Sequence, residues 1–326
     1  MPSIAYQIGD ITIGATYIYS RNSETIRVQE IGSTAAAYYA FLDKGLMTGA
    51  YETWGGTGVH LNESGVDGFP VRENFNGFAL QAEWRELYGE FEYLRGRGEV
   101  GEKLTYWFDF PSQHYTARLG YRVIRGNKLH LFKVEAQLYS LSNSENVLGS
   151  ETVNGITTTK IYASNEIFTV DNFSLSPSYE VMILNGGSAK IGANLLRSYS
   201  RSTQMYPYVD ELKTNCYQLY ISGMLPIKRW ELRAGTLFSM GDIDEDSYRV
   251  SDDIDAGDKP TQLIEYYNIE NEYLTATKLI SSLSLRYNLP RSLYCQAGVS
   301  YIKAFDLSYI EGSNRWSYEF TVGYKF

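Results

Sequence analysis

Apolar and polar residues alternate with a period of two along most of the chain. In residues 78–85 the apolar positions are Phe78, Leu80, Ala82 and Trp84, and Gln81, Glu83 and Arg85 lie between or beside them. The same pattern recurs in residues 115–123, 132–138, 232–240 and 283–287. Because successive side chains of a β-strand point to opposite faces, the pattern predicts strands with one apolar face and one polar face.

A water-soluble β-sandwich also alternates in this way, with its apolar face as the protein core. Two features favour a membrane barrel instead. Strand-like runs such as 127–143, 271–288 and 291–307 are longer than an ordinary strand, which has roughly five or six residues. The connections also alternate between short and long, as in barrels with tight periplasmic turns and longer outer loops.

The positions of these connections predict the strand number. Short turns are expected at 43–45, 85–86, 125–127, 185–187, 226–227 and 289–290. Longer connections are expected at 21–32, 55–75, 97–112, 145–167, 201–212, 241–271 and 309–314. We therefore predict an all-β fold, a transmembrane antiparallel up-and-down barrel of about 14 strands with a range of about 12 to 16 and both termini periplasmic.

This barrel is expected to form a single domain over residues 1–326. Within the longer connections, residues 103–110 and 156–163 are themselves strand-like. Each of the two segments fits either a separate hairpin arm or a strand extension above the membrane.

The composition agrees with a β-rich membrane protein. The chain has 29 tyrosines and 29 glycines but only 8 prolines, a bias towards twisted strands and aromatic interfaces. Its longest apolar stretch, 35–42, is far shorter than the roughly 20 residues of a spanning helix. The mean hydropathy of -0.30 excludes nothing, because a barrel exposes only every second residue to lipid.

Charge and cysteine content narrow the function classes. The net charge of -9 and scattered basic residues argue against a nucleic-acid partner. The alternation places Cys216 on the polar face of its strand and Cys295 on the apolar face, so we expect no disulfide between them. The N-terminal segment 1–6 lacks the features of a secretory signal, and we expect that a signal peptide is absent from this numbering.

The last residues of the chain carry the most specific motif. One parity is Trp316, Tyr318, Phe320, Val322, Tyr324 and Phe326, and the other is polar or glycine. This segment resembles the C-terminal strand of bacterial outer-membrane β-barrels, whose terminal aromatic residue the barrel-assembly machinery recognises. The resemblance implies insertion by that machinery and a location in the outer membrane of a Gram-negative bacterium, with outer-membrane lipid and lipopolysaccharide as surroundings.

Two further likenesses are looser. The tyrosine-rich, acidic composition is similar to that of barrels from Bacteroidota-type bacteria. The strand count resembles that of the long-chain fatty-acid channels, but their plugging N-terminal segment has no counterpart here, because alternation begins by Ile11. We therefore carry over no lipid substrate.

Aromatic residues are predicted near the strand ends, at Tyr17, Tyr19, Trp54, Trp84, Trp230 and Trp316. They fit the aromatic girdles that barrels place at both membrane surfaces. Ordinary packing between neighbouring strands is the alternative explanation.

The polar parity supplies the candidate lumen residues. These are Glu83, Arg85, Glu90, Glu92, Arg118, Arg122, Lys133, Glu135, Lys190, Glu231, Arg233 and Glu319. Such residues either line a water-filled passage or pair across the lumen and close it. A barrel of about 14 strands is wide enough to conduct if no loop folds inward.

We therefore expect a passive channel or transport-associated protein for small polar solutes. The alternative is a structural or interaction barrel whose outer loops bind another envelope protein or a glycan. A hydrolase at the barrel rim is a third hypothesis, and it requires His60 or His114 within reach of a Ser or Asp side chain. No histidine has a catalytic motif around it, so we predict no catalytic residues and no enzymatic activity.

The acidic segment 241–260 raises the question of a metal. Asp242, Asp244, Asp246 and Asp253 have a spacing that loosely imitates a calcium loop, although Ser247 replaces the turn glycine. A solvated acidic outer loop is the other explanation. We expect no cofactor apart from Ca²⁺ at this loop.

Overall fold

The structure is a computed structural model that describes residues 2–26, 38–41, 51–54, 61–62, 65–66, 69–102, 105–183, 186–203, 209–249, 263–290 and 293–324. Within these residues, 13 strands form one antiparallel sheet. They are β1 (Ser3–Ile8), β2 (Ile11–Ile26), β7 (Phe69–Trp84), β8 (Leu87–Glu102), β9 (Thr105–Arg125), β10 (Lys128–Val153), β11 (Ile156–Ile183), β12 (Ser188–Ser202), β13 (Val209–Ile227), β14 (Trp230–Arg249), β15 (Lys278–Asn288), β16 (Leu293–Ala304) and β17 (Asn314–Tyr324).

Two short strand pairs and one helix lie outside this sheet. Strand β3 (Tyr38–Phe41) pairs with β4 (Tyr51–Trp54), and β5 (Leu61–Asn62) pairs with β6 (Gly65–Val66). The helix α1 (Leu263–Thr275) lies between β14 and β15 along the chain. The segment between β14 and α1 is outside the described residues. No helix among the described residues is long and apolar enough to cross a membrane.

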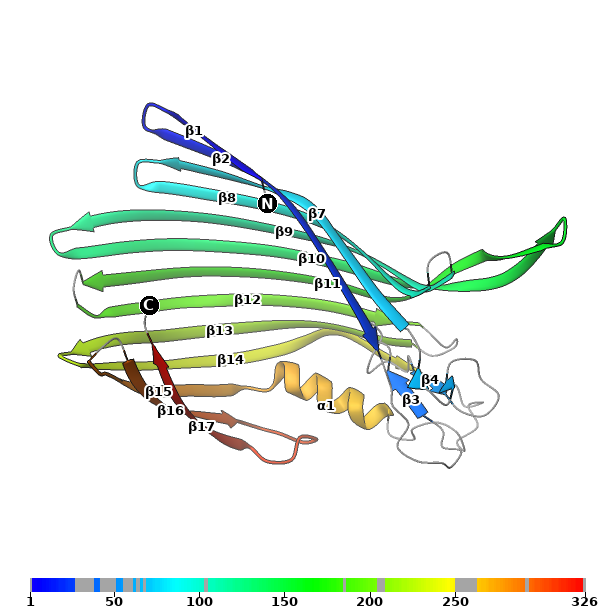
Figure 1. Cartoon of the computed structure of the whole chain (residues 1–326). Coiled ribbons are helices and arrows are strands. Elements are labelled where there is room, and N and C mark those ends of the chain that lie inside the picture. The colour runs from blue at the N-terminus through cyan, green and yellow to red at the C-terminus, as the bar shows by residue number, and fades with distance from the viewer. Residues whose placement is uncertain are drawn as a thin grey trace.

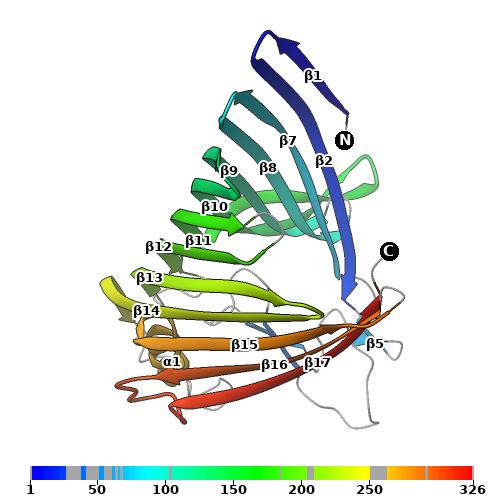
Figure 2. The same cartoon turned by 90° about the vertical axis from the view of Figure 1, so that its left-hand side faces the viewer.

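Each strand of the main sheet pairs with the strands before and after it in that sheet. The sheet curves into an arc (Figures 1 and 2), and its two edges, β1 and β17, are not paired with each other. The prediction of an all-β antiparallel up-and-down fold is confirmed, and the strand count of the described sheet lies within the predicted range.

Short turns join the strands at one end of the sheet. The predicted turns at 85–86, 125–127, 185–187 and 289–290 all lie at this end. The turn predicted at 226–227 lies two residues later, at Lys228–Arg229, because β13 and β14 pair as far as Ile227 and Trp230. Backbone conformation fits these positions, since Arg85, Gly126 and Lys228 all have positive φ, as two-residue hairpin turns demand. The turn predicted at 43–45 lies outside the described residues.

The N-terminal region differs most from the sequence prediction. A turn at Gly9, which has a φ of 58°, and Asp10 folds β1 back on β2. Strand β2 then pairs directly with β7, from Ile11 opposite Trp84 to Ile26 opposite Phe69. Of the strands expected on both sides of 43–45, the described parts are β3 and β4, which pair with each other outside the main sheet. The described sheet has an odd number of strands, so its first and last strands, β1 and β17, run in the same direction. Both run towards the end of the sheet that carries the short turns.

The opposite end of the sheet carries the longer elements. Strands β10 and β11 form a long hairpin that projects beyond the other strands (Figure 1) and ends at a turn of Asn154 and Gly155. Residues 156–163 are thus a strand extension, and 105–110 are part of β9. The connection predicted at 241–271 is only partly a loop, because β14 continues to Arg249 and α1 begins at Leu263.

The apolar parity of the sheet is exposed. Tyr318 is 80% exposed, Ile4 is 72% exposed and Leu219 is 61% exposed, although each is a large apolar side chain. Few apolar side chains of the described residues are buried, and they include Phe108 and Ile167, which pack against each other. A water-soluble sandwich would bury this parity in its core, so the exposure supports a surface made for lipid.

The polar parity lies on the concave side of the arc. Gln137 of β10 and Arg315 of β17 line the same cavity, although their strands are far apart along the sheet. Strands so far apart can share a cavity only on the inner side of a curved sheet. The helix α1 lies against this same side, where Tyr267 donates a hydrogen bond to Asp246 of β14 at 3.0 Å.

Candidate functional site

A row of charged side chains crosses the polar face of β8, β9 and β10. The register places Glu90, Arg118 and Glu135 side by side on adjacent strands. The Arg118 guanidinium forms an ion pair with Glu90 and a second one with Glu135 at 3.1 Å. Lys133 reaches the same Glu135 carboxylate at 2.6 Å. Two carboxylates therefore share two cations, and each carboxylate is held in place on the inner face.

Other predicted lumen residues pair locally on the same face. Arg122 contacts Glu83 at 2.6 Å between β9 and β7. Glu231 and Arg233 pair within β14 at 2.5 Å. Glu92 lies one register step from the Glu90 network, opposite Thr116.

A second group of predicted residues meets around a cavity of about 680 Å³ on the polar face. Lys190 of β12, Arg233 of β14 and Glu319 of β17 line it, together with Glu180 of β11. Serine side chains from neighbouring strands, including Ser222 and Ser284, complete its wall. A cavity with both charge signs and many hydroxyl groups suits water and small polar solutes.

Among the predicted lumen residues, Arg85 lies in a turn and not on a strand. It begins the turn between β7 and β8, with a φ of 54°. Its guanidinium pairs with Asp10 of the neighbouring turn at 3.0 Å and lies over the Trp84 ring. Arg85 therefore connects two short turns at the sheet end.

The four aspartates of the suggested calcium loop do not come together in the described part of the chain. Asp242, Asp244 and Asp246 lie on strand β14, and Asp253 is outside the described residues. Asp244 is bound by Arg197 at 3.1 Å and Lys213 at 2.9 Å, whereas Asp246 accepts its hydrogen bond from α1. Among the described residues no three His, Cys, Asp or Glu side chains form a metal site, and Ca²⁺ binding stays a prediction.

The histidines and cysteines are explained by ordinary contacts. His114 lies on β9 between the rings of Phe75 and Tyr139. His130 bonds the Tyr179 hydroxyl at 2.7 Å, and His60 is outside the described residues. The expectation of no enzymatic activity thus stays a prediction, and the rim hydrolase stays the third hypothesis.

Both cysteines are free, as predicted. Cys216 faces Ser239 on the polar side, with 3.3 Å between the sulfur and the hydroxyl oxygen.

The C-terminal motif forms the edge strand β17. Trp316, Tyr318, Phe320, Val322 and Tyr324 all project from its exposed apolar side, and Phe326 is outside the described residues. Trp316 also packs on Tyr301 of β16 with ring centroids 4.4 Å apart. Trp316 lies near the long-loop end of the sheet, whereas Trp84 and Trp230 flank short turns, so aromatic side chains occur at both ends.

Comparison with known proteins assigns the chain to a family. The whole chain, residues 1–326, matches the family described as "Family of unknown function (DUF6850)". The chain belongs to this family. No curated protein matches the DUF6850 chain.

Solved structures resemble the DUF6850 chain in fold alone. The siderophore receptor PiuA from Acinetobacter baumannii is 10% identical, with a TM-score of 0.51 over 92% of this chain and 48% of the receptor. BauA, the ferric preacinetobactin receptor from Acinetobacter baumannii, is 10% identical, with a TM-score of 0.50 over 92% of this chain and 46% of the receptor. The chain thus spans about half the length of these receptors. The fold is that of outer-membrane β-barrel proteins, in agreement with a location in the bacterial outer membrane.

Parity in the sequence separated the two faces of the sheet, but it missed the helix α1 and the residues around it. The signal was weak: among the helix residues whose burial is described, the buried ones are Tyr267 and Asn271, four positions apart. The acidic residues on both sides of them gave the region the composition of a loop.

Proposed function

We propose that this DUF6850 protein is an outer-membrane barrel that conducts small polar solutes passively. The observation that carries the proposal is the concave face, where carboxylates and cations from β7 to β17 project towards the interior. An open interior lined in this way stays hydrated, because charged side chains fixed on a barrel wall favour water over closure by apolar packing.

The charge pattern supports a passage with little preference for anions or cations. Arg118 is shared by Glu90 and Glu135, and Lys133 adds a second positive charge beside them. Each pair lies within one strand or between adjacent strands of the same wall, so these contacts do not bridge the lumen. Fixed charges of both signs act on permeating ions through their local potential.

Planar-bilayer recording tests the proposal. We expect stepwise conductance from the purified chain, with weak ion selectivity in a KCl gradient. Replacing Arg118→Gln leaves Glu90 and Glu135 less compensated, and should shift the reversal potential towards cation selectivity. Glu83→Gln removes the partner of Arg122 and should shift it the opposite way. Lys160→Gln, which removes a positive charge from the projecting hairpin instead of the concave face, is the matched control and should change nothing.

Two results would contradict the channel. One is the absence of conductance from protein that is folded and inserted. The other is conductance whose selectivity responds equally to Arg118→Gln and Lys160→Gln, since this would place the ion path elsewhere.

A second candidate function is binding of another envelope protein or a glycan. The β10–β11 hairpin favours it, because every side chain from Ser150 to Glu166 is exposed while the two strands stay paired up to Val153 and Ile156. A paired hairpin with exposed side chains that projects beyond the other described strands is well placed to contact a partner.

A further inference from the structure

A second large cavity lies on the concave face, next to the helix α1. Its volume is about 780 Å³, within the size range of sites for small organic ligands. Its walls come from β10 to β17, from the end of α1 and from the segment between β16 and β17. The cavity is separate from the serine-rich one, which lies nearer the short turns.

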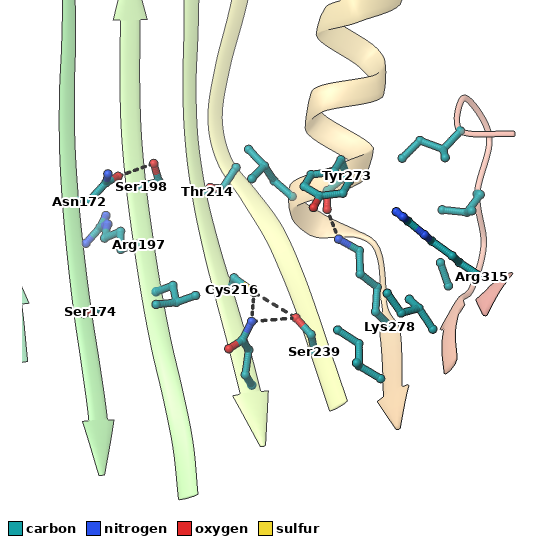
Figure 3. Close-up of a pocket in the computed structure, with 18 of the residues that line it drawn as sticks. Asn172, Ser174, Arg197, Ser198, Thr214, Cys216, Ser239, Tyr273, Lys278 and Arg315 are labelled. Atoms are coloured by element: carbon teal, nitrogen blue, oxygen red, sulfur yellow. Dashed lines mark hydrogen bonds between the residues drawn. The ribbon is translucent and has the colours of Figure 1, made fainter. Parts of the chain in front are cut away.

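Three cations line this cavity. Arg197 of β12 pairs with Asp244 at 3.1 Å, whereas Lys278 of β15 and Arg315 of β17 lie together on the other side of the cavity. Figure 3 shows the Lys278 ammonium and the Arg315 guanidinium both directed towards the space beside Tyr273. Within the described part of the chain, no aspartate or glutamate lines the cavity, although the chain as a whole carries a net charge of -9. A local surplus of positive charge in an acidic protein favours an anionic ligand.

Lys278 and Arg315 differ in the contacts that they already make. Lys278 donates to the backbone carbonyl of Tyr273 and lies 4.4 Å from the centre of its ring. Lys278 thus also caps the C-terminal end of α1, where a positive charge is favourable. Arg315 has no ion pair in the structure as described, so its donors are available to a ligand.

The rest of the lining is divided by chemistry. Leu274, Ile302, Leu307 and Ile310 form an apolar wall near these two cations. Across the cavity lie amide and hydroxyl groups that are partly engaged with each other: Asn172 accepts from Ser198 at 2.6 Å, and Gln218 lies 3.5 Å from the Ser239 hydroxyl. A ligand must therefore combine a negative group for Arg315 with an apolar body for the aliphatic wall.

We infer that this cavity binds an organic anion with a flat or branched apolar body, such as an aromatic carboxylate. Arg315 provides the charged contact, because a guanidinium offers paired donors that match the two oxygens of a carboxylate. The apolar wall removes the body of the ligand from water, which gives affinity in proportion to the area buried. Polar solutes of either sign would pass the wider lumen, whereas this class would be retained beside α1.

Calorimetric titration of the full chain in lipid nanodiscs tests the inference, with 2-naphthoate as the probe and uncharged 2-naphthamide as its matched partner. We expect saturable binding of 2-naphthoate and at least about tenfold weaker binding of 2-naphthamide, the size of effect that a charge-assisted hydrogen bond supplies. Arg315→Gln should weaken 2-naphthoate to the level of 2-naphthamide. Arg315→Lys should retain most of the affinity.

Two controls separate the site from general effects. Lys190→Gln removes a positive charge from the same face but lines the other cavity, and should leave binding unchanged. Ala304→Trp fills the cavity from β16 and should abolish binding of both probes. The inference is overturned if 2-naphthoate does not bind, or if Arg315→Gln and Ala304→Trp bind it as well as the original chain does.

Discussion

At the scale of single residues, Glu272 fixes the helix α1 to the segment between β16 and β17. Its carboxylate accepts hydrogen bonds from the backbone amides of Ser308, Tyr309 and Ile310, the last two at 2.9 and 2.6 Å. Three amides around one carboxylate are a strong anion site. Burial acts to raise the pKa of Glu272, but the three hydrogen bonds outweigh it, and the pKa lies below its ordinary value. Because Ile310 lines the cavity, Glu272 also holds one of its walls.

Acidification should release this contact. A carboxyl group whose pKa is lowered in the folded state stabilises that state above its ordinary pKa, and the contribution is lost as the pH falls through the lowered value. We attach a fluorophore at Glu311→Cys in a chain whose own cysteines are removed by Cys216→Ser and Cys295→Ser. We expect this fluorophore to become more mobile at acidic pH, which lowers its fluorescence anisotropy. Adding Glu272→Gln should produce the mobile state already at neutral pH. Identical pH profiles with and without Glu272→Gln would show that another group controls the segment.

At the scale of elements, sequence parity predicted most strands but not their partners. The faces of β7 to β17 follow from alternation, because each side chain has only two directions to point. Which charges meet depends on register, and the Arg118 contacts with Glu90 and Glu135 required the turn lengths on both sides of β9 to be known. The hairpin of β1 and β2 was missed although Gly9 and Asp10 are turn residues. The strand prediction relied on long loops alternating with short turns, and there is no long loop between β1 and β2. The extension of β10 and β11 was left open, since exposed polar strands carry no parity signal.

Shortening the β10–β11 hairpin should leave the fold intact. Deleting Leu148–Glu151 together with Thr158–Ile161 removes residues that pair with each other and keeps the parity of both arms and their terminal turn. We expect the variant to show the heat-dependent gel shift of a folded barrel and unaltered conductance. If the hairpin binds an envelope partner, a stoichiometric protein that co-purifies in mild detergent with the full chain should be lost. An unfolded variant would mean that the hairpin stabilises the sheet itself.

At the scale of the whole molecule, the sheet separates two environments. The outer face carries large apolar side chains on consecutive strands, and the inner face carries charge pairs between strands such as Arg118–Glu90 and Arg122–Glu83. The edges β1 and β17 present unpaired backbone groups, which hydrocarbon does not tolerate, so a membrane-inserted form requires both edges to be paired. The proposed polar passage and the proposed anion cavity both depend on the apolar parity facing lipid.

Spin-label accessibility in liposomes tests this dependence most directly. With Cys216→Ser and Cys295→Ser as background, nitroxides at Leu219→Cys and Ile221→Cys report on the apolar face of β13, and nitroxides at Gln218→Cys and Ser222→Cys report on the polar face. We predict that oxygen relaxes the first pair more than a water-soluble nickel chelate does, and that the chelate is favoured at the second pair. Equal access of the chelate to all four positions would contradict a lipid-facing surface.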